Sequence, residues 1–223
     1  MITRRDATLG LATGLLLADA APAARADAAP PADTVIALPA PRLDGGMPLY
    51  QALKLRHSTR GYDPRAVSHE TLSTLLWAAY GINRPATGDR TAPYWRHILV
   101  IDIYLAMADG VFLYDPKPHA LRRHLTADIR ALTGLQDFVA TAPLNLVYVA
   151  HGERMQDVPL DERRLYASVD AGFIGQNVYL ACASEGLGSV FRAAVDTGKL
   201  GSALKLPPDQ FVTFAQTIGY AKA

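Results

Sequence analysis

The stretch Leu-Lys-Leu-Arg-His-Ser-Thr-Arg-Gly-Tyr, residues 53–62, follows a short amphipathic run and leads into extended chain. Arg56, Ser58 and Arg60 occupy alternate positions in it. Two guanidinium groups and a hydroxyl in this pattern can converge on one anion, and the planar, permanently charged fork of arginine suits phosphate better than lysine does. Arg and Ser are also ordinary residues of solvated loops. The stretch therefore predicts a phosphate site only if the rest of the chain indicates a ligand that carries a phosphate.

The composition is that of a globular protein. The 223 residues are enough for one domain with a sizeable core, or for two small domains at most. The chain is 50% hydrophobic and 19% charged, which excludes a disordered protein. The net charge of +1 gives no indication of nucleic acid as a partner. The single cysteine, Cys182, excludes an intramolecular disulfide and argues against a thiol-dependent metal site.

The N-terminal residues 1–26 resemble an export signal. Arg4 and Arg5 precede an apolar segment, residues 7–18, and Ala24-Arg25-Ala26 is typical of a cleavage site. The paired arginines make the segment similar to a twin-arginine signal. A dozen helical residues reach about 18 Å, short of the ~30 Å hydrocarbon core, so we predict a periplasmic protein without a stable membrane anchor.

The next segment, residues 27–46, is rich in Ala, Pro, Asp and Gly and predicts an extended linker or arm. One folded domain is expected over residues 47–223. Early in this domain Ser68 is a good N-cap, and Gly81 marks a helix end. The apolar residues between them lie at i, i+3, i+4 and i+7: Leu72, Leu75, Leu76 and Ala79. This spacing predicts a helix that faces the core.

Dense, β-branched apolar residues predict buried strands at residues 98–105 and 144–150. A tight turn at residues 108–110 is expected to return the first strand through residues 111–114. The cationic segment 119–132 is expected to end in a short helix that begins at Thr126.

A long helix is predicted over residues 161–185. It is apolar on most of its circumference, so it must be covered on several sides, in the centre of the domain or in the centre of a dimer. A strand at residues 189–193, a helix capped by Asp196 and a strand at residues 211–219 are expected to complete the chain.

Several common kinds of site are not indicated. No G-x-G-x-x-G follows a predicted strand and no Walker loop is present, so a doubly wound dinucleotide-binding fold is not expected. Ser58 and Ser168 lack the context of a nucleophile elbow. His119, His124 and His151 lack the helical i, i+4 spacing of metal ligands, so we expect surface histidines and no metal site.

Three motifs occur in order: R-H-S-T-R at residues 56–60, L-L-W-A-A-Y-G-I-N at residues 75–83 and G-Q-N-V-Y-L-A-C-A-S-E-G-L-G at residues 175–188. Together they resemble the nitroreductase family of flavin mononucleotide (FMN) oxidoreductases. The likeness covers residues 41–222 and is greatest to the branch that includes the azoline-forming dehydrogenases. It implies an α+β fold with a mixed sheet flanked by helices. It also implies an intertwined homodimer, with the long helix at the interface and two FMN molecules between the subunits.

The resemblance gives the opening stretch a ligand. The family residues that match Arg56, Ser58 and Arg60 hold the ribityl phosphate, and His57 lies beside them along the flavin. A second basic anchor near the C-terminus corresponds to Lys222. Two arginines and a lysine can neutralise a phosphate dianion through charge-assisted hydrogen bonds.

Contacts to the flavin ring are implied in the segment that includes Arg192, Ala193 and Ala194. Glu-Gly or Gly-Gly is common in the family where this chain has the two alanines, so a contact to flavin N5 would come from the backbone. Arg192 has two interpretations. It is a surface residue, or its charge reaches the flavin and favours the reduced anionic ring.

The chain departs from the family pattern at residues 93–99. The family usually has Pro-Ser-Ala-x-Asn-x-Gln there, in a loop that supplies polar contacts to the ring. His97 falls in the asparagine position and is expected to donate one hydrogen bond in its place. Tyr94 and Trp95 either narrow the pocket over the flavin or simply pack the loop.

The resemblance implies a ping-pong mechanism, in which a donor reduces the flavin and a small organic acceptor, such as a nitro compound or a quinone, takes the electrons. The donor in the family is NAD(P)H, of which the periplasm holds little, so the donor stays unknown. No side chain is assigned as a catalytic acid or base. Two alternatives remain open: a flavin-binding or redox-sensing protein without turnover, and a flavin-free relative.

Overall fold

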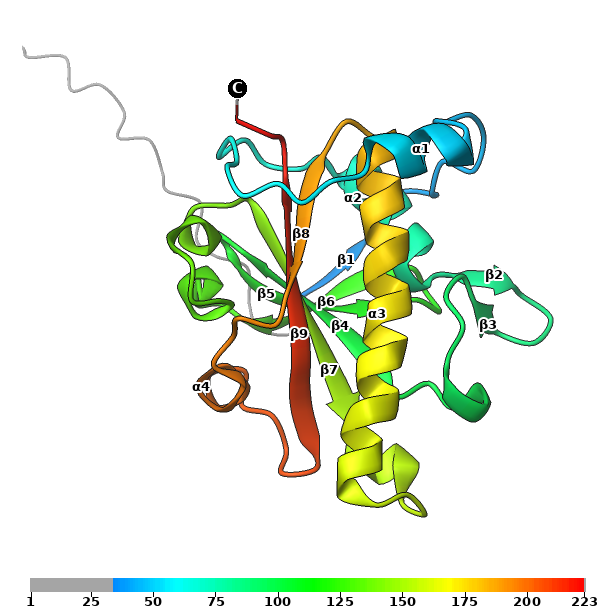
Figure 1. Cartoon of the computed structure of the whole chain (residues 1–223), viewed down its shortest axis with the longest axis vertical. Helices are drawn as coiled ribbons and strands as arrows, with labels where there is room; N and C mark the ends of the chain where they lie inside the picture. The colour runs from blue at the N-terminus through cyan, green and yellow to red at the C-terminus, as the bar shows by residue number, and fades with distance from the viewer. Residues whose placement is uncertain (1–33, 223) are drawn as a thin grey trace, which may run out of the picture.

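The computed structural model describes residues 34–222, so the predicted export signal and the start of the predicted linker lie outside the described residues. A seven-stranded sheet with the strand order β1-β6-β5-β4-β7-β9-β8 forms the centre of the molecule (Figure 1). Its strands are β1 (Val35–Ala37), β4 (Ile101–Met107), β5 (Gly110–Asp115), β6 (Ala120–Leu125), β7 (Leu144–His151), β8 (Gly188–Arg192) and β9 (Gln210–Gly219). A separate small hairpin consists of β2 (Ile82–Arg84) and β3 (Asp89–Arg90).

Four α-helices and four short 3₁₀ segments accompany the strands in residues 34–222. The helices are α1 (Leu49–Leu55), α2 (His69–Tyr80), α3 (Leu160–Ser184) and α4 (Thr197–Ala203). The 3₁₀ segments are η1 (Trp95–His97), η2 (Arg130–Leu132), η3 (Asp137–Ala140) and η4 (Gly152–Met155). The α+β class predicted from the sequence is confirmed. All neighbouring strands in the large sheet pair antiparallel, and parallel pairing within residues 34–222 is confined to an isolated bridge between Ser58 and Ser189.

The sheet lies between two helical layers, with α3 on one face and α4 on the other (Figure 1). The alternation along the central strand β7 explains why both faces are covered. Leu144, Leu146 and Tyr148 belong to the core shared with α2 and α3, whereas Val147 and Val149 belong to the core shared with α4. Every residue of β7 is buried, and the sequence of the strand is accordingly apolar except at Asn145 and His151.

The two main helices begin and end close to where their sequence signals predict. The Ser68 side chain accepts a hydrogen bond from the Thr71 N–H (3.2 Å) at the start of α2, and Gly81 caps the end of that helix. The long helix α3 packs so closely on β8 that a Cβ at Gly175 would overlap the ring of Phe191. The absence of a side chain at Gly175 therefore allows α3 to approach the strand closely.

One stripe of α3 and much of α1 remain exposed although they are apolar. The exposed large side chains on these two helices are Leu49, Tyr50, Leu53, Leu55, Leu160, Leu165, Val169 and Phe173. Buried residues such as Ala167, Ile174 and Val178 lie on the opposite side of α3, against the sheet. Within residues 34–222, no helix is long and apolar enough to span a membrane.

Two expectations from the sequence are wrong. Folded structure begins before Met47, because β1 pairs with β6 at the edge of the sheet. The segment expected to lead into a helix at Thr126 instead forms β6, followed by η2. Cross-strand partners explain this difference: Arg122 pairs with Asp115 (2.8 Å), and the buried Arg123 donates to the Asp109 carbonyl (2.6 Å). The arginines make the sequence of this segment resemble a solvated loop, but within the sheet each of them has a hydrogen-bonding or ionic partner.

Candidate functional site

The cationic stretch runs along the ends of β8 and β9 and is held there by backbone hydrogen bonds. The Thr59 N–H donates to the Ser189 carbonyl (2.9 Å), and the Lys222 N–H donates to the Gly61 carbonyl (3.0 Å). Gly188 permits this approach, because a Cβ at that position would lie 2.7 Å from the Thr59 side chain. These bonds bring the backbone of Lys222, near the C-terminus, beside the early cationic stretch.

Tyr179 of α3 orients one of the predicted phosphate ligands. Its hydroxyl oxygen accepts a hydrogen bond from the Phe191 N–H (2.8 Å) and lies 2.9 Å from Ser58 Oγ. Either hydroxyl of this pair can be the donor; when the tyrosine donates, the serine proton is free for a further acceptor. The guanidinium carbon of Arg56 lies 5.2 Å from the centre of the same ring, within the range of a cation–π interaction.

A cleft of about 470 Å³ opens at this place. Lys54, Arg56 and His57 line one side, and Tyr179 with the turn at residues 186–189 lines the other. Ser58, Arg60 and Lys222 are exposed close to it on the same two segments. The structure thus brings five predicted ligands to one region: Arg56, His57, Ser58, Arg60 and Lys222. Burial raises the pKa of the Cys182 thiol at the base of the cleft, so this cysteine is not an activated nucleophile.

Two residues of this cleft were missed from the sequence. Lys54 lies two residues before Arg56, but it belongs to the amphipathic run that forms α1. Tyr179 lies in the third family-like motif, where its neighbours are apolar. The Tyr179 hydroxyl, on an otherwise apolar stretch of helix, is the signal that could have identified this residue. A hydroxyl that packs against the protein needs a hydrogen-bond partner.

Arg192 is buried, with 4% of its surface exposed, so its interpretation as a surface residue is wrong. Its guanidinium donates to the Thr133 carbonyl (2.9 Å), to Thr217 Oγ1 (2.9 Å) and to Asn145 Oδ1 (3.3 Å). Desolvation lowers its pKa to about 10, so it remains charged at neutral pH. Since these donors are bound by protein oxygens, Arg192 joins β8, β9 and β7 internally and is not available to a ligand without rearrangement.

Ala193 and Ala194 follow β8 at the open edge of the sheet. Ser189 and Phe191 direct backbone groups away from β9, towards Thr59 and Tyr179 respectively. Ala193 lies just beyond the end of the strand and is exposed. Ala193 lies about 13 Å along the chain from Ser189 at about 3.3 Å per residue.

The loop that departs from the family pattern is packed against its own chain. Trp95 stacks on Tyr166 with ring centres 5.1 Å apart, and the backbone N–H of Trp95 donates to the Asp170 carboxylate (3.1 Å). Tyr94 donates a hydrogen bond to Asp89. These contacts agree with the interpretation in which the aromatic residues pack the loop. Arg96 and His97 have positive φ angles of 46° and 58°, a conformation that is uncommon for residues other than glycine.

His97 lies in a different cleft from Arg56. That second cleft has a volume of about 580 Å³, and its polar lining includes Arg90, His97, Asp102 and Arg154. The loop meets α3 at Asp170, whereas the cationic stretch meets α3 at Tyr179, about 13 Å along the helix axis. A single chain therefore does not bring His97 together with the other predicted ligands.

Comparisons with known proteins agree with this fold. The family model described as the nitroreductase family matches residues 53–220. A nitroreductase-like protein of Methanocaldococcus jannaschii is 33% identical over 168 residues, which cover 71% of this chain and 84% of that protein. The crystal structure of a nitroreductase-like protein from Ralstonia eutropha JMP134 has a TM-score of 0.81 at 44% sequence identity. The match covers 85% of this chain and 90% of that one.

A more distant structure shows the same fold. The NADPH:FMN oxidoreductase of Vibrio harveyi, solved with NAD⁺, has a TM-score of 0.57 at 20% identity, and the match covers 78% of this chain and 69% of that one. The class that the fold defines is that of the nitroreductase-like α+β proteins. This chain belongs to the nitroreductase family, whose members are generally flavin-dependent oxidoreductases.

Proposed function

We propose that this protein is an FMN-dependent oxidoreductase that moves hydride or electrons between a donor and a small organic acceptor. The observation that supports this most directly is the group of donors at the edge of β8. Arg56 and Ser58 precede α2, Lys222 follows β9, and the three residues lie beside one cleft. In the described residues, the Arg56 guanidinium and the Lys222 ammonium make no hydrogen bond to a protein acceptor, so both are available to an anionic ligand.

The residues present fit FMN. Two guanidinium groups, an ammonium group and the hydroxyl of Ser58 match the charge and the acceptors of a phosphate dianion. The edge of β8 leads from there to the exposed residue Ala193, whose backbone would contact the other end of an elongated ligand. Bound FMN would supply a ring that takes up and returns two electrons. The protein would position that ring, exclude water from it and tune its potential.

A homodimer would complete this site. The exposed apolar side chains of α1 and α3 form a surface that a second copy of the chain would cover. Association would be favoured because it buries this apolar surface. His97 does not reach the cationic cleft within one chain. We propose that the partner subunit brings its own copy of the His97 loop to the flavin.

The substrates are proposed by class. A donor would reduce the cofactor and leave, and a nitro compound, a quinone or a similar acceptor would then occupy the same place. NAD(P)H is the family donor, and an exported protein would use another source of electrons. The twin-arginine signal at residues 1–26, the periplasmic location and the branch near the azoline-forming dehydrogenases remain predictions.

A second candidate is a flavin-binding or redox-sensing protein without turnover. The stacked Trp95 and Tyr166 favour it, because a loop fixed in this way leaves less freedom to admit a substrate. Photoreduction of the purified protein without oxygen, followed by addition of quinones or nitroaromatics, separates the two functions. Rapid reoxidation by these acceptors supports the oxidoreductase, and reoxidation by oxygen alone supports the second candidate.

The cofactor itself is tested by absorbance. Purified protein is expected to show the near-ultraviolet and blue bands of flavin, or to acquire them after incubation with FMN. The double variant Arg56→Ala/Arg60→Ala is expected to lose most of this absorbance. The control variant Arg122→Ala removes an exposed arginine that pairs with Asp115 on another strand, and should retain it. A wild-type protein that takes up no FMN, or a double variant with full occupancy, would contradict the proposal.

A further inference from the structure

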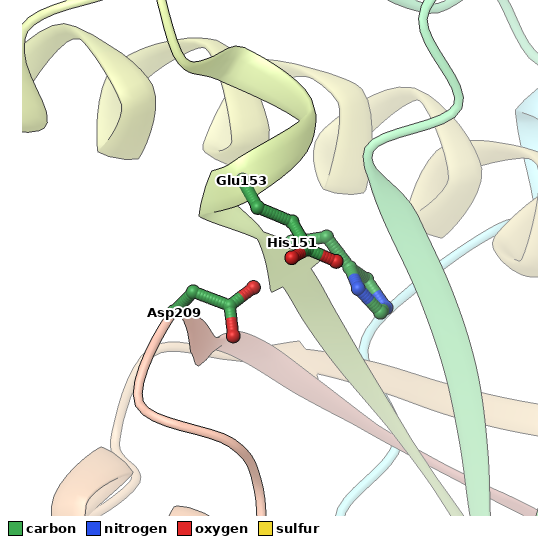
Figure 2. A group of neighbouring side chains, drawn as sticks. All are labelled: His151, Glu153 and Asp209. Carbon is green, nitrogen blue, oxygen red and sulfur yellow. The ribbon is translucent and has the colours of Figure 1, made fainter.

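A second group of polar side chains lies far from the cationic cleft. His151 ends β7, Glu153 belongs to η4, and Asp209 directly precedes β9 (Figure 2). One nitrogen of His151 and one carboxylate oxygen from each acid lie within 4.8 Å of one another. The strand register pairs His151 with Gln210, which places Asp209 beside His151 although the two are distant in sequence. The cationic cleft lies about 30 Å away, at the other end of β9 (Figure 1).

His151 distinguishes this group from an ordinary cluster of acids. Its side chain is buried, with 6% of the residue exposed, so its prediction as a surface histidine is wrong. Nε2 lies 2.7 Å from Asp102 Oδ2, whereas Nδ1 is buried and has no hydrogen-bond partner within residues 34–222. Asp209 Oδ2 is also buried without a partner in the described part of the chain. Such unpaired atoms are destabilising unless something binds them.

We propose that His151 Nδ1 and the carboxylates of Glu153 and Asp209 bind one divalent transition-metal ion, of which Zn²⁺ fits the donor set best. One imidazole and two carboxylates suit zinc, and three protein ligands leave a fourth position for water. Asp102 supports this assignment, because histidines that bind metals usually hold a carboxylate or a carbonyl with their other nitrogen. The hydrogen bond to Asp102 directs Nδ1 towards the two acids.

The distances between the three ligand atoms and the charge of the surrounding side chains also fit a bound metal ion. Ligand atoms about 2.0–2.2 Å from a tetrahedral ion lie roughly 3.5 Å apart, so only a small movement of the exposed Glu153 is needed. The two positive charges would offset Glu153 and Asp209, while Arg154, 3.4 Å from Asp102 Oδ1, offsets Asp102. The ion would join η4 to the chain entering β9, at the base of the sheet.

The experiment uses the full-length chain without an affinity tag, treated with a chelator and then dialysed. Titration with zinc sulfate in a calorimeter is expected to show one site per chain, and the bound ion should raise the unfolding temperature. Glu153→Gln and Asp209→Asn, which keep the side-chain shape, are each expected to weaken binding at least tenfold. Asp157→Asn removes an exposed carboxylate from the same connection and should bind as the wild type does.

His151→Gln provides an independent test, because glutamine can keep a hydrogen bond to Asp102 but offers no imidazole nitrogen. Circular dichroism and FMN uptake monitor whether each variant folds, so a failure of the flavin assignment is distinguishable from a failure of the metal site. Loss of zinc binding in folded His151→Gln supports the site. The absence of saturable binding below about 100 µM zinc, or equal affinity in wild type and the three ligand variants, would overturn it.

Discussion

Arg56 lies beside the edge strand β8 and Arg192 ends it, but the two arginines have opposite environments. Arg192 is buried, and its donors are bound by Thr133, Asn145 and Thr217. Arg56 is half-buried, and within residues 34–222 the one interaction of its guanidinium is with the face of the Tyr179 ring. A cation whose donors are bound by the protein stabilises the fold. A cation held in place by an aromatic ring, with its donors unbound, is available to a ligand.

The largest effect is expected from Arg192→Met. The substitution leaves the buried Asn145 and Thr217 oxygens without their donor, and breaking a buried charged network typically costs about 3–5 kcal/mol. The free energy of unfolding, measured in urea, should fall by that amount. A change below about 1 kcal/mol would show that Arg192 does not have the structural role assigned to it here.

Arg56→Met is the matched substitution on the other side of the comparison. Its free energy of unfolding should change by less than about 0.5 kcal/mol, because the side chain has no bound protein acceptor. Its FMN affinity should fall by about 2–4 kcal/mol, roughly 30-fold to 1,000-fold, which fluorescence titration of the apoprotein measures. If Arg56→Met kept its FMN affinity but lost stability, Arg56 would have the structural role assigned here to Arg192.

A smaller effect is expected at Asp170, which fixes the His97 loop to α3. Burial raises the pKa of its carboxyl to about 6, although the hydrogen bond from the Trp95 N–H acts in the opposite direction. A raised pKa gives a contribution to stability that is complete below about pH 4 and is lost as the pH rises through about 6. Asp170→Asn stays neutral, so its stability relative to wild type should increase by about 2 kcal/mol between pH 4 and pH 7.

Urea unfolding of wild type and Asp170→Asn at four pH values between 4 and 7 measures this difference. Asp161→Asn, an exposed change near the start of the same helix, is the control and should show no such trend. A difference that is constant with pH would mean that Asp170 titrates normally in the folded protein.

The smallest effect is expected from Tyr179→Phe. The variant keeps the ring beneath Arg56 but removes the hydroxyl that contacts Ser58 and the Phe191 N–H. One lost hydrogen bond is worth about 1 kcal/mol, so stability and FMN affinity should each fall by about that amount. An FMN affinity equal to that of wild type would show that the orientation of Ser58 does not matter for binding.

Local signals in the sequence predicted the helices and several of the strands. Ser68 and Gly81 mark the ends of α2 because capping depends on residues a few positions apart. The cationic stretch at residues 56–60 was identified for the same reason, since its pattern is contained in five consecutive residues. The motif at residues 175–188 predicted the end of α3 and the start of β8.

Contacts between distant residues were decided by the tertiary structure. The burial of Arg192 depends on oxygens from η2, β7 and β9, and the pairing of β6 depends on acids in and before β5. The sequence alone shows a histidine at the end of an apolar run and a distant aspartate. Only the pairing of β7 with β9 places His151 beside Asp209, because hydrogen-bond register acts across a sheet and leaves no mark on local composition.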